Sequence, residues 1–213
     1  MTNSKVLLFD LGNVLLPIDL DLTFKGFAKY SSKYSFEEIK KITHELGLWE
    51  AYESGNQSED EFRSFLKKEL HLICTKEQFD EAFNALLLDI PVESYLTLQQ
   101  FKPNFKSLNL LSNTSSIHSN IYFKNNIGPN GENLFDLFDQ IFLSYELGLV
   151  KPDALIYQKV AENLQVDYKD IIFFDDNAAN IETALNLGIQ AILINPNTSL
   201  LQITNTLSNY VDE

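Results

Sequence analysis

Short apolar runs that alternate with helix-length segments constrain the fold of this 213-residue chain more than any other feature. Four predicted strands lie in the C-terminal half: Ser107–Leu111, Gln140–Leu143, Ile171–Phe174 and Ala191–Ile194. Predicted helices separate or follow them, one beginning near Ser115, then Asp153–Leu164, Asn177–Leu187 and a last one after Pro196. This alternation is typical of a parallel sheet with right-handed crossovers, so we predict an α/β fold. The Asn- and Gly-rich segment 125–133 is expected to be a surface loop.

A further strand, Val6–Phe9, is predicted before these elements, and it ends at Asp10. Between about Leu20 and Leu88 the pattern becomes helical, and a helix over Val92–Phe101 follows. Three apparent capping boxes start helices in the block, pairing Ser35 with Glu38, Ser58 with Glu61 and Thr75 with Gln78. We therefore predict a core of residues 1–16 and 92–213, with a helical block, residues 17–91, inserted after the first strand. Such a block would cover the carboxyl ends of the strands, where open α/β sheets bind ligands.

Charge and cysteine content exclude several classes of function. Sixteen Lys and Arg against thirty Asp and Glu give a formal net charge of −14, which opposes binding to nucleic acid or anionic lipid. The single cysteine, Cys74, cannot form an internal disulfide, and we assign it no role. Asp10 interrupts the N-terminal apolar run, and nothing approaches the roughly 18 apolar residues of a membrane span. We expect a soluble, cytoplasmic protein.

Polar residues follow four of the predicted strands. They are Asp10 after the first, Ser112-Asn113-Thr114 after the second, Lys151 on the loop after the third, and Asp175-Asp176 after Ile171–Phe174. In a parallel sheet these four ends meet at one edge. Carboxylates of this kind hold Mg²⁺, while a hydroxyl, helix N–H groups and an ammonium neutralise phosphoryl oxygens. The pattern therefore predicts metal-assisted handling of a phosphate group.

Four segments in order resemble the motifs of the haloacid dehalogenase superfamily of hydrolases, in its helical-cap branch. They are Phe9–Val14, Leu111–Thr114, Lys151-Pro152 and Phe174–Asn180. The resemblance covers nearly the whole chain and implies a Rossmann-like sheet with helices on both faces and an inserted cap. It also implies a Mg²⁺-dependent phosphomonoester hydrolase of a small metabolite. The Asp-Leu-Gly-Asn-Val form of the first motif resembles a branch described as sugar-1-phosphate phosphatases, which makes a sugar phosphate the expected substrate.

The resemblance implies a nucleophile and a metal site. Asp10 would attack the phosphoryl group and form an aspartyl-phosphate, which is covalent catalysis by a carboxylate. Mg²⁺ would be held by the Asp10 carboxylate, the Gly12 backbone carbonyl and Asp176. Asp175 would lie nearby or act through a water molecule.

The resemblance also implies how the phosphate is held. Ser112 and the Asn113 amide would take phosphoryl oxygens, and Lys151 would balance the charge gathered around Asp10. The segment Tyr52-Glu53-Ser54-Gly55 resembles the cap loop that reaches toward the substrate in related members.

One position departs from the pattern. Phosphatases of the superfamily usually carry a second Asp two residues after the nucleophile, which protonates the leaving oxygen, and here that residue is Gly12. Such assistance is worth about 10²- to 10⁴-fold, so its loss should slow ester hydrolysis unless another group substitutes. A good leaving group, such as an anomeric oxygen, would lessen the need for an acid. Asp19 is one candidate substitute.

Each of these residues also has a purely structural interpretation. Asp10 could be a turn residue, Asp175 and Asp176 could cap a helix, Ser112 and Thr114 could be caps, and Lys151 could be a solvated surface lysine. Two adjacent acids directly after an Ile-Ile-Phe-Phe run are hard to explain by capping alone, which favours the metal role. His44, His71 and His118 lack metal-ligand spacing and are expected at the surface or between helices, and Trp49 and Tyr52 in the cap core or at its contact with the sheet domain.

Two other functions remain open. A 2-haloacid dehalogenase also uses a nucleophilic aspartate and lacks the second acid, although the pair Asp175-Asp176 suits a divalent cation that dehalogenation does not need. A non-catalytic protein that binds a phosphorylated ligand could keep the same pocket without turnover.

Overall fold

The computed structural model describes residues 3–211 apart from residues 48, 126–127 and 129–130. Its strands form one parallel sheet in the order β3-β2-β1-β4-β5. The strands are β1 (Asn3–Phe9), β2 (Phe105–Ser112), β3 (Gln140–Leu143), β4 (Ile171–Asp175) and β5 (Gln190–Leu193). The central β1 has β2 on one side and β4 on the other, so the strand order reverses there. Open α/β sheets bind ligands outside the carboxyl ends of the strands at such a switch point.

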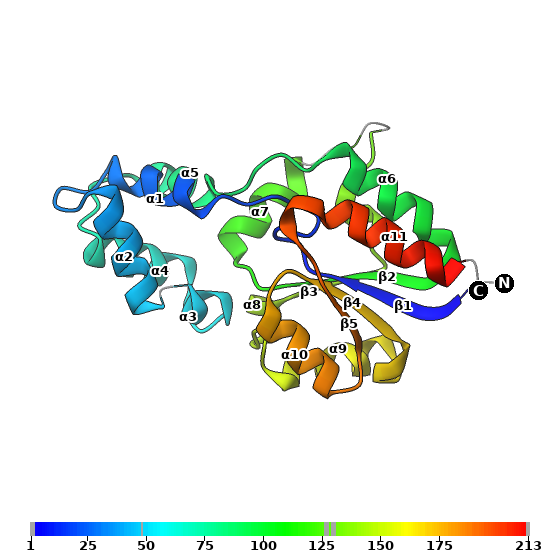
Figure 1. The fold of residues 1–213 in the computed structure, drawn as a ribbon. Helices are drawn as coiled ribbons and strands as arrows, with labels where there is room; N and C mark the ends of the chain where they lie inside the picture. Colours follow the sequence, from blue (N-terminus) through cyan, green and yellow to red (C-terminus); the bar gives the residue numbers. More distant parts are fainter. Residues whose placement is uncertain (1–2, 48, 126–127, 129–130, 212–213) are drawn as a thin grey trace.

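Helices cover both faces of the sheet (Figure 1). Alternate residues of β1 enter different cores, Leu7 and Phe9 on one face and Val6 and Leu8 on the other, all almost fully buried. The first face packs against α6 (Val92–Phe101) and α11 (Ser199–Val211), and the second against α9 (Ala154–Leu164) and α10 (Ala178–Asn186). This double coverage explains why the strands are apolar without alternation, and it confirms the predicted α/β fold class.

Among the described residues, five helices lie between β1 and α6, beyond the carboxyl ends of the strands (Figure 1). They are α1 (Leu20–Ala28), α2 (Phe36–Leu46), α3 (Glu50–Glu53), α4 (Glu59–Glu69) and α5 (Lys76–Asn84). The three predicted capping boxes are present and begin α2, α4 and α5. These helices share a hydrophobic core of their own that includes Phe27, Phe62 and Phe83. We refer to them as the cap helices; the domain boundaries at residues 17 and 91 stay a prediction.

Two further helices connect the sheet to the cap helices. They are α7 (Ser116–Asn125), which follows β2, and α8 (Ser144–Leu147), which follows β3. Ile117 of α7 packs into the core of the cap helices. Four short 3₁₀ helices complete the described structure: η1 (Lys102–Asn104), η2 (Leu134–Leu137), η3 (Tyr168–Asp170) and η4 (Pro196–Thr198). Residues 126–127 and 129–130 of the predicted loop lie outside the described residues. Over the described residues, no helix has both the length and the apolar character needed to cross a membrane.

Candidate active site

A buried lysine joins two aspartates at the carboxyl edge of the sheet. Lys151 Nζ lies 2.7 Å from Asp10 Oδ1 and 2.7 Å from Asp175 Oδ2, and it also donates to the Leu111 carbonyl at 3.0 Å. The Lys151 side chain is 1% exposed. Asp10 directly follows β1, and its N–H donates to the Phe174 carbonyl of β4 at 2.8 Å. Three sequence-predicted site residues, from three separate strand ends, are therefore in direct contact.

Asn113 fixes the main chain of Lys151. The Asn113 Nδ2 group donates to the Lys151 carbonyl at 2.9 Å, and the Lys151 N–H donates to Asn113 Oδ1 at 2.9 Å. This double hydrogen bond ties the loop after β2 to the loop after β3 across 38 positions of sequence. The side-chain amide of Asn113 is therefore occupied by the Lys151 main chain. The main-chain N–H of Asn113 is the amide that remains for a phosphoryl oxygen.

Three carboxylates converge beside the lysine. Asp10, Asp175 and Asp176 each offer an oxygen, and these oxygens lie within 4.8 Å of one another. Both oxygens of Asp175 are already engaged, accepting from Lys151, the Asn177 N–H and the Asn180 amide. Asp176 accepts from Asn13 Nδ2 at 3.0 Å. These contacts favour Asp10 and Asp176 as direct ligands of an ion, with Asp175 behind them.

Asn13 positions Asp176 from the loop after β1. It has a left-handed backbone with φ +56°, a conformation that Asn tolerates better than most residues with a side chain. Its Oδ1 accepts from the Ile18 N–H at 3.3 Å while its Nδ2 reaches Asp176. The first predicted motif therefore holds the fourth through a side chain that the sequence argument did not single out.

The charge of the cluster suits a divalent cation. Three ionised carboxylates and one ammonium carry −3 + 1 = −2. Burial raises the pKa of Asp10 to about 7, opposed by Lys151 and aided by the neighbouring Asp175. Burial also raises the pKa of Asp176. For Lys151, burial disfavours the charged form, but the negative charges of Asp10 and Asp175 outweigh this effect and raise the pKa of the lysine. Hard carboxylate oxygens with excess negative charge are what Mg²⁺ requires, so these residues fit the ion.

Beside this cluster lies a cavity of about 120 Å³ between the sheet edge and the cap helices. Gly12, Ser112, Asn113 and Thr114 line it from the sheet side. A Cβ added at Gly12 would meet Ile18 Cδ1 at 3.4 Å, an ordinary van der Waals contact. Ser112 and Asn113, two of the three predicted phosphate-binding residues, therefore face a shared space, and Gly12 leaves part of it open; Lys151, the third, is not among the residues that line it.

The cap helices and the residues that adjoin them supply the other wall of the cavity. Glu53 of α3 lines it, with Trp49 directly before α3 and Leu86 and Leu87 after α5, together with His118 and Tyr122 of α7. Trp49 also stacks on Phe83, with ring centroids 5.1 Å apart, as expected for a residue of the cap core. No sequence pattern indicated a role for Tyr122 or for Glu53 by itself. Glu53 lies in the segment that resembles a substrate-facing loop.

The structure places Asp19 elsewhere. Asp19 is the N-cap of α1, and its Oδ1 accepts from the Asp21 N–H at 3.0 Å. It lines a separate surface hollow with Lys40 and His44, whereas Ser112 lines the 120 Å³ cavity. Its position is explained by helix capping, and nothing in the geometry favours it as the substitute acid. Cys74 lies between α4 and α5, half-buried against the core of the cap helices, and burial raises the pKa of its thiol.

His118 lies buried between α7 and cap helix α5. Its Nδ1 is 2.9 Å from Asn84 Oδ1, and its ring stacks on Phe83 with centroids 4.1 Å apart. Burial lowers the pKa of His118 to about 3, so the imidazole is neutral in the folded protein at neutral pH. Of the two sequence-predicted environments, the surface and the space between helices, it occupies the second.

This burial predicts acid sensitivity. The unfolded chain binds a proton at His118 below about pH 6.5, whereas the folded protein does so only near pH 3. The His118 contribution to stability is thus present above pH 6.5 and is lost as pH falls, by about 1.4 kcal/mol per pH unit. We expect urea unfolding at pH 6, 5 and 4 to show that the wild type loses stability faster than His118→Gln by this amount. Equal slopes for the two proteins would contradict the assignment.

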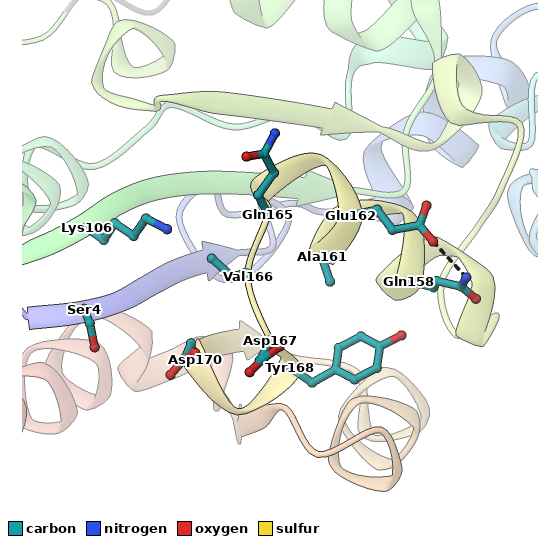
Figure 2. A pocket seen from close by; sticks show the side chains of 10 residues that line it. All are labelled: Ser4, Lys106, Gln158, Ala161, Glu162, Gln165, Val166, Asp167, Tyr168 and Asp170. Atoms are coloured by element: carbon teal, nitrogen blue, oxygen red, sulfur yellow. Dashed lines mark hydrogen bonds between the residues drawn. The ribbon is translucent and has the colours of Figure 1, made fainter.

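A larger hollow, of about 910 Å³, lies at the opposite edge of the sheet (Figure 2). Ser4 lies near the start of β1, Lys106 near the start of β2, and Asp170 directly before β4. This hollow is therefore at the amino ends of the strands, whereas Asp10 follows the carboxyl end of β1. The residues that line it are Ser4, Lys106, Gln158, Ala161, Glu162, Gln165, Val166, Asp167, Tyr168 and Asp170. Its size does not make it the reaction site, because the convergent carboxylates are elsewhere.

The fold and the cluster define an α/β protein with a carboxylate and lysine centre at the switch point of a parallel sheet. Residues 4–188 match the family model described as haloacid dehalogenase-like hydrolase. The chain therefore belongs to the haloacid dehalogenase-like hydrolase family, as the four motifs predicted.

Individual relatives agree with this assignment. The chain is 27% identical over 190 residues to D-ribitol-5-phosphate phosphatase of Bacteroides thetaiotaomicron, covering 87% of this chain and 89% of that protein. A family enzyme of the same organism, solved with magnesium and inorganic phosphate, superposes with TM-score 0.82 at 30% identity, covering 91% of this chain and 96% of the other. A hydrolase of this family from Porphyromonas gingivalis superposes with TM-score 0.86 at 25% identity, over 99% and 98% of the two chains.

Proposed function

We propose that this protein is a Mg²⁺-dependent phosphomonoester hydrolase that uses Asp10 as its nucleophile. The observation that carries the proposal is the contact of Lys151 with Asp10 and Asp175, with Asp176 within ion-binding distance of both aspartates. A carboxylate at the switch point of the sheet, beside a buried ammonium, is placed to attack a phosphoryl group.

The reaction divides into two displacements. In the first, an Asp10 oxygen forms a bond to phosphorus while the bond from phosphorus to the ester oxygen breaks, leaving an aspartyl-phosphate. In the second, water attacks that phosphorus, the bond to Asp10 breaks, and inorganic phosphate leaves. Lys151 balances the charge around Asp10 and its bound phosphoryl group throughout. The Ser112 hydroxyl and the Asn113 N–H bind phosphoryl oxygens from the start of the segment that leads into α7.

Asp10, the Gly12 carbonyl and Asp176 would hold the metal ion. When bound there, Mg²⁺ supplies positive charge to the phosphoryl oxygens and orients them for attack. Asp175 positions Lys151 through their ion pair and is itself held by Asn180. Gly12 leaves the usual position of the acid without a side chain.

The substrate that we propose is a small phosphorylated metabolite, with sugar and polyol phosphates first. The support is a relative named for D-ribitol 5-phosphate and a cavity of about 120 Å³, which suits a small leaving group. We propose that residues 17–91 form a cap domain over this cavity and that residues 1–16 and 92–213 form the catalytic core. Action in the cytoplasm, without a nucleic acid partner, stays a prediction from the sequence.

A substrate panel tests this function. Purified protein is incubated with sugar, polyol and nitrophenyl phosphates, with Mg²⁺ or with excess EDTA, and phosphate release is measured. We expect release that requires Mg²⁺. Chloride release from 2-haloacids without metal would support a dehalogenase instead, and tight binding of phosphoesters without any phosphate release would support a non-catalytic binding protein.

A further inference from the structure

Hydrolysis of an alkyl phosphate needs a proton for the leaving oxygen, and Gly12 cannot supply it. A poor leaving group accepts a proton as its bond to phosphorus breaks, and general acid assistance is worth about 10²- to 10⁴-fold. The missing donor must lie on the leaving-group side of Ser112 and Asn113, in the cavity that these residues share with Gly12.

Glu53 enters this cavity from the cap helices. Among the described residues that line it, Glu53 is the one with a carboxyl group. Glu53 is half-buried at the C-terminal end of α3, so its side chain is neither solvated freely nor sealed in the cap core. A carboxyl group that lines the cavity beside the predicted phosphate-binding residues is of the kind that exchanges a proton with a leaving oxygen.

Two contacts seat this part of the cap on the sheet domain. On one side of Glu53, the Tyr52 hydroxyl lies 3.0 Å from Ser116 Oγ of α7. On the other side, the backbone of Gly55 approaches the Tyr145 carbonyl so closely that an added Cβ would overlap it, and Gly55 has φ +73°. Both contacts reach elements that follow strands β2 and β3. The position of Glu53 over the sheet edge is therefore set from both directions.

The Ser116 contact is itself anchored within the cap. Ser116 Oγ donates to Glu59 Oε1 at 2.9 Å, and Glu59 Oε2 accepts from the buried Arg63 at 2.7 Å. Arg63 also donates twice to Asp80, at 2.7 and 2.9 Å. This chain of charge-assisted hydrogen bonds links α7 to cap helices α4 and α5.

Tyr122 of α7 lines the same cavity as Glu53. Burial raises the pKa of the Tyr122 hydroxyl, and the negative charges of Asp10 and Glu53 both contribute to this rise. The same hydroxyl lies 2.7 Å from Thr114 Oγ1, two residues beyond Ser112. Thr114 and Tyr122 line the cavity together with Ser112 and Glu53, so Glu53 shares its space with the predicted phosphate-binding segment.

The other titratable groups that line the cavity are poorer donors. The pKa of His118 is lowered to about 3 by burial, so it carries no acidic proton at neutral pH, and its Nδ1 faces Asn84. The raised pKa of Tyr122 makes its hydroxyl a weak acid. Asp19 caps α1 and lines a different hollow.

We propose that Glu53 is the general acid and base of this enzyme, acting across the cavity in place of a residue at position 12. This inference rests on the proposed phosphatase function. As the bond from phosphorus to the ester oxygen breaks, its electron pair goes to that oxygen, which takes the Glu53 carboxyl proton and leaves as an alcohol. The Glu53 carboxylate then takes a proton from the water that attacks the aspartyl-phosphate. Inorganic phosphate leaves, and Glu53 is protonated again.

The leaving group distinguishes this role from a merely structural one. A nitrophenolate departs without a proton, whereas an alkoxide does not. We expect Glu53→Gln to lower kcat/KM for a polyol phosphate by about 10²- to 10⁴-fold, with kcat/KM for nitrophenyl phosphate near the wild-type value. Glu45 is an exposed acid on cap helix α2, and Glu45→Gln serves as the matched control. It should leave kcat/KM unchanged for both substrates.

Rescue at position 12 provides a second, independent measurement. Gly12 has room for the Cβ of an added side chain, which would meet Ile18 Cδ1 at 3.4 Å, an ordinary van der Waals contact. If Glu53 carries the proton, Gly12→Asp in the Glu53→Gln background should restore much of the polyol phosphate rate. In the wild-type background the same substitution should change that rate little, because a donor is already present.

The outcomes separate this inference from the proposed function. Equal losses of kcat/KM for polyol and nitrophenyl phosphates in a folded Glu53→Gln protein would overturn the general acid role, as would an unchanged kcat/KM for the polyol phosphate. If the wild-type protein hydrolyses neither ester with Mg²⁺, the phosphatase function itself fails. Circular dichroism of each variant shows whether it remains folded.

Discussion

Replacing Asp10 by Asn is expected to abolish phosphate release from every phosphoester that the wild-type protein hydrolyses. The amide keeps the size of the side chain but cannot attack phosphorus, and it also weakens the metal set. Loss of a covalent nucleophile lowers kcat by about 10⁴-fold or more in enzymes where this has been measured. We expect kcat to fall by at least that factor, measured as phosphate release at saturating concentrations of substrate and Mg²⁺.

The fold of this variant should be retained, because Asn can still accept a hydrogen bond from Lys151. Removing the negative charge of a buried carboxyl whose pKa is already raised to about 7 should not destabilise the protein strongly. Phosphoester binding, measured by calorimetry, should therefore persist in Asp10→Asn. Phosphate release within tenfold of the wild-type rate would exclude Asp10 as the nucleophile.

Lys151→Met should have the second largest effect, on stability as well as on activity. Met preserves most of the volume of the side chain but leaves two buried carboxylates, Asp10 and Asp175, facing each other without a cation. Removing one partner of a buried ion pair costs about 3–5 kcal/mol. We expect a loss of this size in the free energy of unfolding, measured with EDTA at pH 8. The loss of a charged group beside the phosphoryl oxygens should also lower kcat by about 10²- to 10³-fold.

The pH dependence of this variant provides its control. At pH 5.5 Asp10 can accept a proton, since its pKa is already raised to about 7 with the lysine present. Protonation relieves the repulsion, so the destabilisation by Lys151→Met should be smaller at pH 5.5 than at pH 8. A variant as stable as the wild type at both values would show that the lysine does not hold the two carboxylates together.

Much of the fold could be predicted because the signals are local. The strand Gln140–Leu143 and the helix Val92–Phe101 have the predicted bounds, since apolar runs and proline breaks define both. The first strand begins earlier than predicted, at Asn3, because Asn3 pairs with Phe105 of the neighbouring strand. Hydrogen bonding to a neighbour extends strands into polar residues, and a single sequence carries no record of that neighbour.

The sequence predicted the site residues that follow the strands. It did not predict the hydrogen bonds between distant residues that hold them in place. Asp10, Lys151 and Asp175 meet as expected from parallel strand ends. The double hydrogen bond between Asn113 and Lys151 joins residues 38 positions apart, and no local pattern indicates such a contact.

The contacts between the cap helices and the sheet domain could not be predicted from the sequence either. It depends on α8, whose four residues are too few to show a helical period, and on close approach of the Gly55 backbone to Tyr145. Asp19 was considered as an acid although its place directly before a helix is typical of an N-cap, which is the role the structure gives it.

The most direct test of the account is to trap the covalent intermediate. The enzyme is mixed with a phosphoester and Mg²⁺, quenched in acid within the first turnover, digested, and analysed by mass spectrometry. We expect a phosphoryl group on the peptide that contains Asp10, absent when EDTA replaces Mg²⁺ and absent in Asp10→Asn. Steady phosphate release with no phosphoryl group on that peptide, or with one on another residue, would contradict the assignment of Asp10 as the nucleophile.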